Sequence, residues 1–408
     1  MAKCRIGTAK FFTLLLLLYR TSIKTGELND DYIFETEEHI TQEAISHSSA
    51  KIYPTDTVVI AMYGATIGKV GILGIPAATN QACACAIVRP STDYKYLFYY
   101  AQSQKDDFIK KGKGGAQPNI SQEIIKFHQF PLPPLAEQHR IVDRIESLFA
   151  KLDEAKEKAQ AVVDSFETRK AAILHRAFTG ELTAKWREEH GVGMESWEKF
   201  KFNELGTLER GRSKHRPRND PKLFGGKYPF IQTGDVARSG MYITEHTQTL
   251  SELGAEQSKL FPKGTLCITI AANIGDVSIL TYDCCFPDSV VGFTPNERTL
   301  SEYIYYLMST LQREIEVNAP ATAQKNINLR ILNDLLLDIP SVAEQTQIVN
   351  QVEYLFFQEQ HTKETAEIVL NQIDLMKNSI LARAFRGELG TNDPSEESTV
   401  ELLKRTIL

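Results

Sequence analysis

The 408-residue chain lacks the usual sequence signatures of catalysis and of metal binding. It contains no HExxH, no GxSxG and no GxGxxG after an expected strand, and its nine histidines show no ligand spacing. No CxxC pair has a matching partner, which argues against a zinc site and for reduced cytosolic thiols. We therefore expect a binding protein rather than an enzyme, with no metal or cofactor of its own. The six cysteines are Cys4, Cys83, Cys85, Cys267, Cys284 and Cys285.

An excess of positive charge is also missing, because the formal net charge is -6. Any surface of this chain that binds nucleic acid must therefore be local. With 42% hydrophobic and 24% charged residues, the composition is that of a globular protein, and the length allows two or three domains.

The apolar run FFTLLLLLY, residues 11–19, is too short to cross a bilayer as a helix. Together with the basic residues before it, the run is similar to the start of a signal peptide, but no small-x-small cleavage site follows. We expect instead a buried strand, or an abnormal start of the reading frame, in a cytoplasmic protein that does not bind a membrane.

The chain does contain an internal repeat. The segment PLPPLAEQHRIVDRIESLF (131–149) returns 207 residues later within LDIPSVAEQTQIVNQVEYLF, which ends at Phe356. The stretches that follow end in ILHRAFTGEL (173–182) and ILARAFRGEL (380–389). Upstream, TIGKV (66–70) returns as NIGDV, and the residues between such anchors diverge. A constant frame with a variable face suggests one mechanical role and two different targets.

The two copies differ at their front. Repeat 2 opens with residues 197–236, whereas repeat 1 joins it late, at IKTGEL (23–28), the counterpart of IQTGDV (231–236). Residues 1–22 do not resemble residues 197–230. The first copy therefore lacks the opening segment of the second.

Each repeat ends in a predicted long helix with a heptad seam. The first helix, from about 135 to 178, would be roughly 60 Å long at 1.5 Å per residue. In the second seam Glu359 and Thr362 are polar, which weakens the case for pairing unless a lysine of the other helix meets the charge. We expect the two helices to pair antiparallel; the alternative is two surface helices, each packed on its own domain. The expected pairing residues are Ile141, Ile145, Leu148, Leu152, Ile348, Val352, Leu355, Val369 and Ile373.

The parts of the chain before these helices have mixed strand and helix patterns. Apolar, β-branched runs predict strands, and two of them follow a glycine turn. We expect the tyrosines and phenylalanines of the predicted helices to lie in the core rather than to stack on bases. The predicted strands are 56–63, 69–75, 265–271 and 276–282, and the predicted helices are 94–104 and 301–312.

The segment GATIGKV (64–70) is superficially similar to a phosphate-binding loop. Three residues rather than four separate its glycines, and Val70 follows the lysine where the motif has Ser or Thr. The second copy has Asp276 in place of Lys69. We expect a turn between two strands; the alternative, an enzyme that binds a nucleotide here, would need phosphate binding by Lys69.

Two loops are candidates for binding DNA. RGRSKHRPRNDPK (210–222) has six Lys/Arg against one Asp, and its cations could follow a phosphate backbone or read a guanine edge, or simply be solvated. In repeat 1 the basic loop is KKGKGGAQPN (110–119), whose counterpart is VNAPATAQKN (317–326). The amides of these loops could contact DNA or could equally cap the following helix. The candidate residues are Arg210, Arg212, Lys214, Arg216, Arg218, Lys222, Gln324, Lys325, Asn326, Lys110, Lys111, Lys113, Gln117 and Asn119.

A variable domain, then PLPPLAEQ-x-x-IV, then a long helix ending AF-x-GEL, twice over, resembles the specificity subunit of type I restriction-modification systems. Repeat 2 also has a similar opening, with Trp197, Leu205-Gly206 and Arg210-Gly211. The resemblance covers residues 23–390. It implies an α+β fold: two mixed α/β target-recognition domains separated by two long antiparallel coiled-coil helices, with an internal two-fold repeat. Each domain would read one half of a split target in double-stranded DNA.

The resemblance also implies partners. Such a subunit is not catalytic; it docks two methyltransferase subunits, which flip and methylate adenine with S-adenosylmethionine. Restriction subunits, which use ATP and Mg²⁺, would join them to cut unmethylated DNA. The short front of repeat 1 departs from the family pattern. The alternative hypothesis is therefore a scaffold or inactive allele that binds methyltransferase subunits without recognising DNA. The expected boundaries are 1–134 first target-recognition domain, 135–182 first helix, 183–196 linker, 197–341 second target-recognition domain, 342–389 second helix and 390–408 polar tail.

Overall fold

The described chain forms two compact units. The first unit combines the N-terminal part of the chain with its last part, from Glu367 on, and the second unit is Ala161–Ala366. The apolar run at 11–18 lies outside the described residues. Among the residues that are described, no helix is long and apolar enough to cross a membrane. The computed structural model describes residues 19–114, 118–212, 220–271, 274–318, 329–393 and 395.

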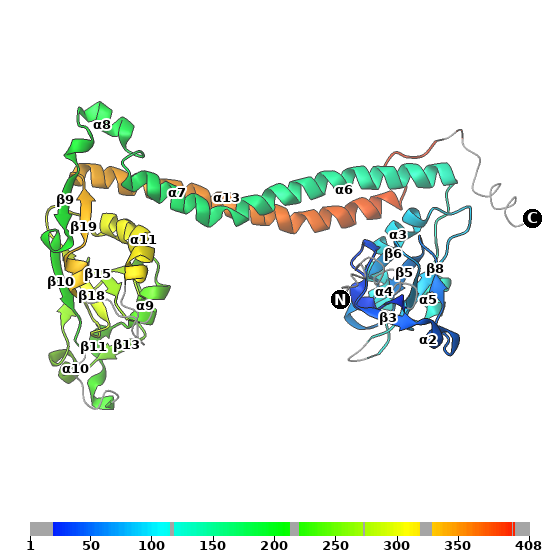
Figure 1. The fold of residues 1–408 in the computed structure, drawn as a ribbon, viewed down its shortest axis with the longest axis horizontal. Helices are drawn as coiled ribbons and strands as arrows, with labels where there is room; N and C mark the ends of the chain where they lie inside the picture. Colours follow the sequence, from blue (N-terminus) through cyan, green and yellow to red (C-terminus); the bar gives the residue numbers. More distant parts are fainter. Residues whose placement is uncertain are drawn as a thin grey trace, which may run out of the picture. The chain divides into compact units, whose positions relative to one another are not determined.

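The first unit is built from short strands and helices followed by one long helix (Figure 1). Its elements are β1 (Tyr19–Ile23), β2 (Tyr32–Ile33), β3 (Glu38–Thr41), α2 (Gln42–Ser46), β4 (Ile52–Tyr53), β5 (Val58–Ala61), η2 (Gly64–Thr66), β6 (Val70–Leu73), β7 (Ala77–Thr79), β8 (Cys83–Ala86), α3 (Tyr94–Ser103), α4 (Lys105–Lys111), α5 (Gln122–Lys126) and α6 (Leu135–Asp164).

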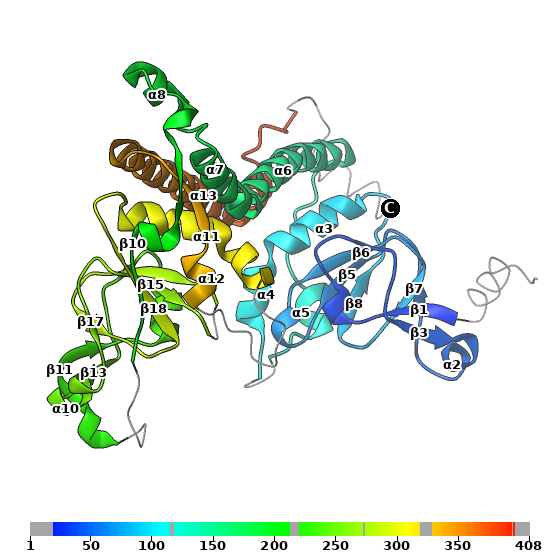
Figure 2. The ribbon, with the colours of Figure 1, turned by 60° about the vertical axis from the view of Figure 1, so that its left-hand side comes forward.

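Two four-stranded sheets form the core of the first unit, in the orders β3-β1-β7-β4 and β2-β6-β5-β8. All four residues of β5 are buried, and β5 pairs antiparallel with both β6 and β8. Helix α3 lies over the second sheet (Figure 2) and buries Phe98 against Val58, Ile60 and Ile72. The aromatic face of α3 therefore belongs to the core, as predicted.

The second unit repeats this plan with additional strands. Its elements are α7 (Phe166–Phe178), α8 (Ala184–His190), β9 (Glu198–Lys201), β10 (Gly206–Arg210), η5 (Pro221–Leu223), β11 (Phe224–Phe230), α9 (Thr233–Arg238), β12 (Tyr242–Ile243), β13 (Gln248–Leu250), α10 (Glu252–Glu256), β14 (Leu260–Phe261), β15 (Leu266–Thr269), β16 (Val277–Leu280), β17 (Cys284–Cys285), β18 (Val290–Pro295), α11 (Ser301–Asn318), α12 (Leu329–Asn333) and β19 (Leu336–Ile339). Two helices cross the boundary between the units. Helix α13 (Val342–Ala384) begins in the second unit and ends in the first, and the last residues of α6, from Ala161 on, belong to the second.

Strands β11–β18 of the second unit repeat the sheet orders of strands β1–β8 of the first. The orders in the second unit are β13-β11-β17-β14 and β10-β18-β15-β16-β12, and β19 pairs with β9. When β10 is left out, the order β18-β15-β16-β12 corresponds to the order β8-β5-β6-β2 of the first unit. The described residues of the first unit hold no counterpart of β9, β10 or β19. The internal repeat predicted from the sequence is thus a repeat of sheet topology.

The predicted strands and helices of both copies are confirmed. The segment GATIGKV, for which we predicted a turn, forms η2 and the connection between β5 and β6. At the end of this turn Gly68 has a φ of +77°, a conformation that L side chains rarely adopt.

The duplicated Ala-Glu-Gln segment has a structural reason in Gln138. Its side chain is fully buried. Its carbonyl oxygen accepts the backbone N–H of Asp93 (2.8 Å), and its amide donates to the carbonyls of Ser91 (3.0 Å) and Pro133 (2.8 Å). One side chain therefore ties the first turn of α6 to the entry of α3.

Gln345 does the same in the second unit. It is fully buried, accepts the backbone N–H of Leu300 (3.0 Å), and donates to the carbonyls of Arg298 (2.8 Å) and Pro340 (2.9 Å). These partners stand 207 positions after those of Gln138. The sequence pattern showed that this glutamine is repeated. It did not show that the buried side chain joins the first turn of a long helix to the start of another helix, the role that we call a bracket.

The predicted antiparallel pairing of the long helices is confirmed within each unit. In the first, Asp153 of α6 pairs with Lys377 of α13 (2.5 Å). In the second, Arg169 of α7 pairs with Glu359 of α13 (2.5 Å), and Lys363 lies over the Phe166 ring (4.7 Å to its centroid). The partner of the seam charge Glu359 is thus an arginine rather than the lysine that we considered.

Two details of the helices correct the sequence analysis. The first helix, predicted as one element to about 178, is divided at Ser165, whose hydroxyl donates to the carbonyl of Ala161 (2.5 Å). Such back-bonding competes with the helical pattern and bends helices. In α13 Val369 is 37% exposed and does not face the seam, which contains Leu370 instead.

The cause of the second error is the helical period. A straight α-helix has 3.6 residues per turn, so strict heptad spacing drifts off the contact face by about 20° per heptad. Inward positions of α13 follow each other as Glu359, Lys363, Ala366, Leu370 and Ile373, whereas Thr362 is exposed. The other predicted pairing residues are at least half-buried: Ile141, Ile145, Leu148, Leu152, Ile348, Val352, Leu355 and Ile373.

Candidate nucleic-acid interface

The N-terminal end of the basic loop 210–222 in the second unit is fixed by close contact with the backbone around Phe286. Arg210 ends β10, and its Nε donates to the carbonyl of Asp288 (3.1 Å). A Cβ on Gly211 would lie 2.2 Å from the carbonyl oxygen of Phe286, so no larger residue fits without a shift of the backbone. The N–H of Arg212 donates to the same carbonyl (3.1 Å).

The C-terminal end of this loop is a short helical turn. Asp220 caps η5 by accepting the N–H of Lys222 (3.0 Å), and the hydroxyl of Ser251 donates to the Lys222 carbonyl (2.7 Å). Both ends of the loop are therefore fixed, with Arg210 and Arg212 at its start and Lys222 at its end. The three further candidates of this loop lie outside the described residues: Lys214, Arg216 and Arg218.

The basic loop of the first unit, 110–119, is anchored to the end of β5. Lys113 and Asn119 exchange two backbone hydrogen bonds of 2.9 Å, and the N–H of Gly64 donates to the carbonyl of Pro118 (2.8 Å). Tyr63 forms a β-bridge with Asn119 and is 44% exposed, so an exposed aromatic residue lies next to the end of this loop. Sequence reasoning missed Tyr63, and no motif signalled it.

Helix capping, the alternative role for Asn119, belongs to another residue. Ser121 is the N-cap of α5, and its hydroxyl accepts the N–H of Ile124 (3.3 Å). A DNA contact by Asn119 stays a prediction. The remaining amide and lysine candidates lie outside the described residues: Gln117, Gln324, Lys325 and Asn326.

Lys111, at the C-terminal end of α4, belongs to a polar cluster under the first loop. Its Nζ lies 2.6 Å from Asp107 and 3.2 Å from Nδ1 of His128. The hydrogen bond from Lys111 lowers the pKa of Asp107, while burial, followed by the Lys111 charge, lowers the pKa of His128. Because an ammonium only donates, Nδ1 accepts, and Nε2–H of the neutral imidazole donates to Gln104 (3.2 Å). Lys110 and Lys113 are exposed.

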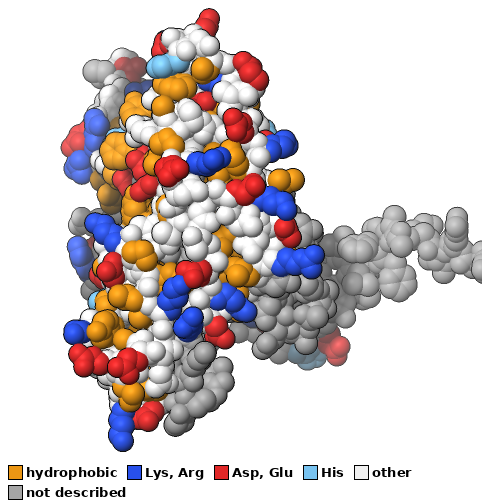
Figure 3. Space-filling view, turned by 90° about the vertical axis from the view of Figure 1, so that its left-hand side faces the viewer, with side chains coloured by type: hydrophobic (Ala, Val, Ile, Leu, Met, Phe, Trp, Pro, Cys, Tyr) orange, Lys and Arg blue, Asp and Glu red, His pale blue; other side chains and the backbone are white. Residues whose placement is uncertain are grey.

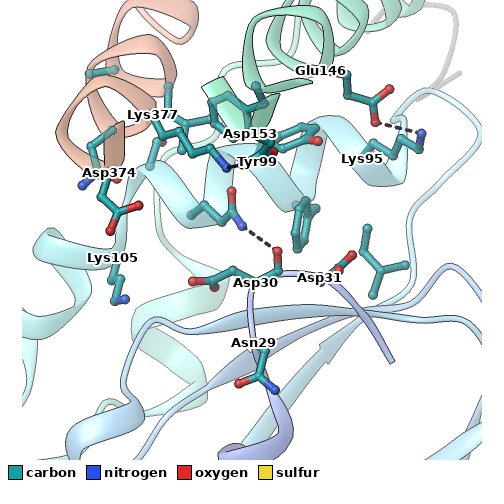
Figure 4. Close-up of a pocket in the computed structure, with 18 of the residues that line it drawn as sticks. Asn29, Asp30, Asp31, Lys95, Tyr99, Lys105, Glu146, Asp153, Asp374 and Lys377 are labelled. Atoms are coloured by element: carbon teal, nitrogen blue, oxygen red, sulfur yellow. Dashed lines mark hydrogen bonds and ion pairs between the residues drawn. The ribbon is translucent and has the colours of Figure 1, made fainter. Parts of the chain in front are cut away.

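A cavity of about 1020 Å³ in the first unit lies between α3, the loop before β2 and the two long helices (Figure 4). Two of its three lysines are paired, Lys95 with Glu146 (2.8 Å) and Lys377 with Asp153 (2.5 Å). Six carboxylates line it, so its net charge is negative and it repels phosphates. They are Asp30, Asp31, Asp106, Glu146, Asp153 and Asp374.

One face of the second unit mixes both signs of charge with apolar side chains (Figure 3). The described part of this face therefore has no stripe of a single sign. Within the described ranges, no group of three or more His, Cys, Asp or Glu could hold a metal ion. The five described cysteines are free, and burial raises the pKa of Cys83 and Cys284 to about 12.

The segment expected as a linker, 183–196, carries a buried ion pair. Arg187 of α8 lies 2.6 Å from Glu344 of α13, which also accepts from Thr183 (2.7 Å) and from the indole N–H of Trp197 (3.1 Å). Arg187 also donates to the carbonyl of Gly180 (2.5 Å). These bonds fix the start of β9 to the first turn of α13.

The comparisons with known proteins bear on this duplicated fold. The family described as "Type I restriction modification DNA specificity domain" matches residues 19–163 and 194–370, one match for each copy. The chain belongs to this family. The resemblance stated from the repeat is therefore confirmed.

Several characterised relatives are similar over most of the chain. The specificity subunit of the EcoKI type I restriction enzyme from Escherichia coli strain K12 is 25% identical over 92% of this chain and 82% of its own length. The StySPI specificity subunit of Salmonella potsdam is 22% identical over the same shares. The crystal structure of the HsdS subunit from Thermoanaerobacter tengcongensis is 18% identical, covers 91% of both chains and has a TM-score of 0.66, which confirms the fold.

Proposed function

We propose that this chain is the DNA sequence-recognition subunit of a type I restriction-modification complex. The observation that carries the proposal is the duplicated specificity domain, with two sheets of the same topology that present unlike loops. Two equivalent frames with different faces suit the reading of two unlike half-sites. The target is thus a split sequence in double-stranded DNA, and the chain itself performs no chemistry.

The basic loops are the proposed contacts to the DNA. Loop 210–222 and loop 110–119 are both anchored at their ends by backbone hydrogen bonds, which leaves exposed cations such as Lys110 and Lys113 available to phosphates. Amides and arginines at such positions can read base edges in the major groove. Tyr63 adds an aromatic group beside the loop of the first unit.

The proposed partners are two methyltransferase subunits and the restriction subunits. A solved structure of the same fold, with a TM-score of 0.62, is titled as the basis of complex assembly of the type I restriction-modification system. In the present chain, α13 exposes large apolar side chains in both units, with Tyr354 64% and Phe357 69% exposed in the second and Leu375 68% exposed in the first. An exposed apolar helix face of this kind suits a partner helix.

S-adenosylmethionine, ATP and Mg²⁺ belong, in this proposal, to the partner subunits. Methylation of adenine in a duplex needs a flipped base and a methyl donor, and DNA translocation needs a nucleotide. The role of this chain is to place the methyltransferase subunits at the target.

A map of methylated adenine tests the function. The chain is expressed with its cognate methyltransferase subunit, and modified positions are read by single-molecule sequencing. A split motif with two unlike halves supports the proposal. Assembly of the complex without any methylated motif contradicts it and supports the scaffold reading.

The loops are tested by the salt dependence of DNA binding. Each phosphate contact contributes roughly 0.9 to the slope of log K against log salt. We expect Lys110→Ala with Lys113→Ala, and separately Arg216→Ala with Arg218→Ala, to weaken binding and to reduce that slope. Lys185→Ala, an exposed lysine on α8, is the control and should leave the slope unchanged. Slopes equal to the parent in both double variants would remove the loops from the interface.

A further inference from the structure

Among the described strands of the first unit, β8 has a neighbour on one side only. The sheet order is β2-β6-β5-β8, so β8 is an edge, whereas its counterpart β18 lies between β10 and β15. In an antiparallel pair every second residue of a strand bonds to its neighbour. The N–H of Met62 donates to the carbonyl of Ala82, so Ala84 and Ala86 are the residues of β8 that bond to β5. The N–H and C=O of Cys85 therefore point away from the sheet.

Side chains along this edge are more exposed than their counterparts in the second unit. Ala86 is half-buried where Phe293 is fully buried, and Ile125 of α5 is half-buried where Leu332 of α12 is 1% exposed. Ile87, directly after β8, is 62% exposed. In the second unit β10 contacts α12 and pairs with β18, which is the cover that the first unit lacks among its described residues.

We infer that the open edge of β8 is completed by a strand from residues 11–18 of the same chain, FFTLLLLL, added antiparallel where β10 lies in the second unit. Seven of these eight residues are apolar and none is charged, so the segment gains from burial. It precedes β1 in the chain as β10 precedes β11. An added strand would satisfy the free backbone groups of the edge.

The connection to β1 is long enough for this placement. In the second unit the residues after β10 bond to Phe286 and Val290, and the neighbouring Cys285 pairs with Phe230 of β11. In the first unit the equivalent point is Thr79, which pairs with Ile23 at the end of β1. From there to Tyr19 is roughly 13 Å along the strand, a span that about four or five extended residues cover. A strand that ends near Leu14 therefore reaches the edge.

Hydrogen exchange in the full chain tests the inference, read by mass spectrometry on peptides that cover residues 80–92. The reference is a variant without residues 2–18, and protection of β5 in both proteins shows that the first unit is folded. We expect exchange at Cys85 to be at least tenfold slower in the full chain. Equally fast exchange at Cys85 in both proteins overturns the inference.

Two proline variants keep the test independent of the deletion. Neighbouring N–H groups of a strand point to opposite sides, so only one of Phe12→Pro and Thr13→Pro removes a donor to β8. We expect one of them to lose the protection at Cys85, while Ala2→Pro keeps it. Protection at Cys85 could instead survive both prolines and the deletion, and rise with protein concentration as a dimer mass appears. That result would assign the edge to a second copy of the chain and overturn the inference.

Discussion

The buried pair of Arg187 and Glu344 is expected to behave as a single unit in the stability of the second domain. Replacing Arg187 by Met leaves the Glu344 carboxylate buried with only Thr183 and Trp197 as donors. Removing one partner of a buried ion pair costs about 3–5 kcal/mol. We expect the Arg187→Met variant to lose this amount of unfolding free energy.

Neutralising the second partner should recover much of that loss. In the double variant Arg187→Met with Glu344→Gln, no charge is buried. The amide oxygen can accept from the indole N–H of Trp197, and the amide N–H can donate to the hydroxyl of Thr183, which has lost Arg187 as a donor. The remaining defect is the carbonyl of Gly180, which loses its donor, worth about 1–3 kcal/mol. The double variant should therefore be more stable than Arg187→Met alone.

The chain carries its own probe for this measurement. Both of its tryptophans, Trp186 and Trp197, lie in the second unit, so their fluorescence in a urea titration follows the unfolding of that unit. The control is Lys185→Met on the same helix, whose exposed pair with Glu189 is worth at most about 1 kcal/mol. Single-variant losses below about 1 kcal/mol, or a double variant equal to the sum of its singles, would refute the reasoning.

Three further outcomes are expected. Gln138→Ala and Gln345→Ala should each cost about 1–3 kcal/mol in urea unfolding, because each leaves two part-buried or buried carbonyls without the donor of the wild-type side chain. Losses near zero would contradict a stabilising role for these glutamines. Gly211→Ala should weaken DNA binding through a displaced loop end, while Gly26→Ala, with no atom within 4 Å of its Cβ, should not. Because the pKa of His128 is lowered in the folded protein, the unfolded chain binds a proton first as the pH falls through 6.5, and folding is destabilised. Protection of residues 105–128 in hydrogen exchange, corrected for intrinsic rates, should therefore decrease as the pH falls. The variant His128→Gln should lose this pH dependence.

Sequence periodicity predicted that the long helices pair, and it erred where the heptad spacing drifts off the contact face and where a side chain is amphipathic. The heptad count selected Thr362 and Val369, which are exposed, over Lys363 and Leu370. Lys363 lies inward because its half-buried side chain brings the ammonium over the face of the Phe166 ring. A hydrophobicity pattern counts every lysine as outward-facing, so it cannot place such a residue.

The candidate site was predictable in composition but not in its supports. Clustered Lys and Arg with proline marked 210–222 as a basic loop. The need for Gly211 arises from the backbone of Phe286, about 75 positions further along the chain, and no local pattern contains that contact. Tyr63 was missed for the same reason, since its partner Asn119 is brought to it by the fold.

The chemistry of the two brackets explains how the copies can diverge while their frame stays constant. Gln138 binds main-chain atoms of Ser91, Asp93 and Pro133, and Gln345 binds the same main-chain atoms of Arg298, Leu300 and Pro340. Serine and arginine, or aspartate and leucine, are interchangeable there because every residue supplies the same carbonyl and, apart from proline, the same N–H. The ends of the helices follow the same rule: Arg187 donates to the carbonyl of Gly180, and Arg140 donates to that of Thr391. A frame held through backbone groups leaves the side chains of the sheets and loops free to change, which is the condition for two domains that read different DNA sequences.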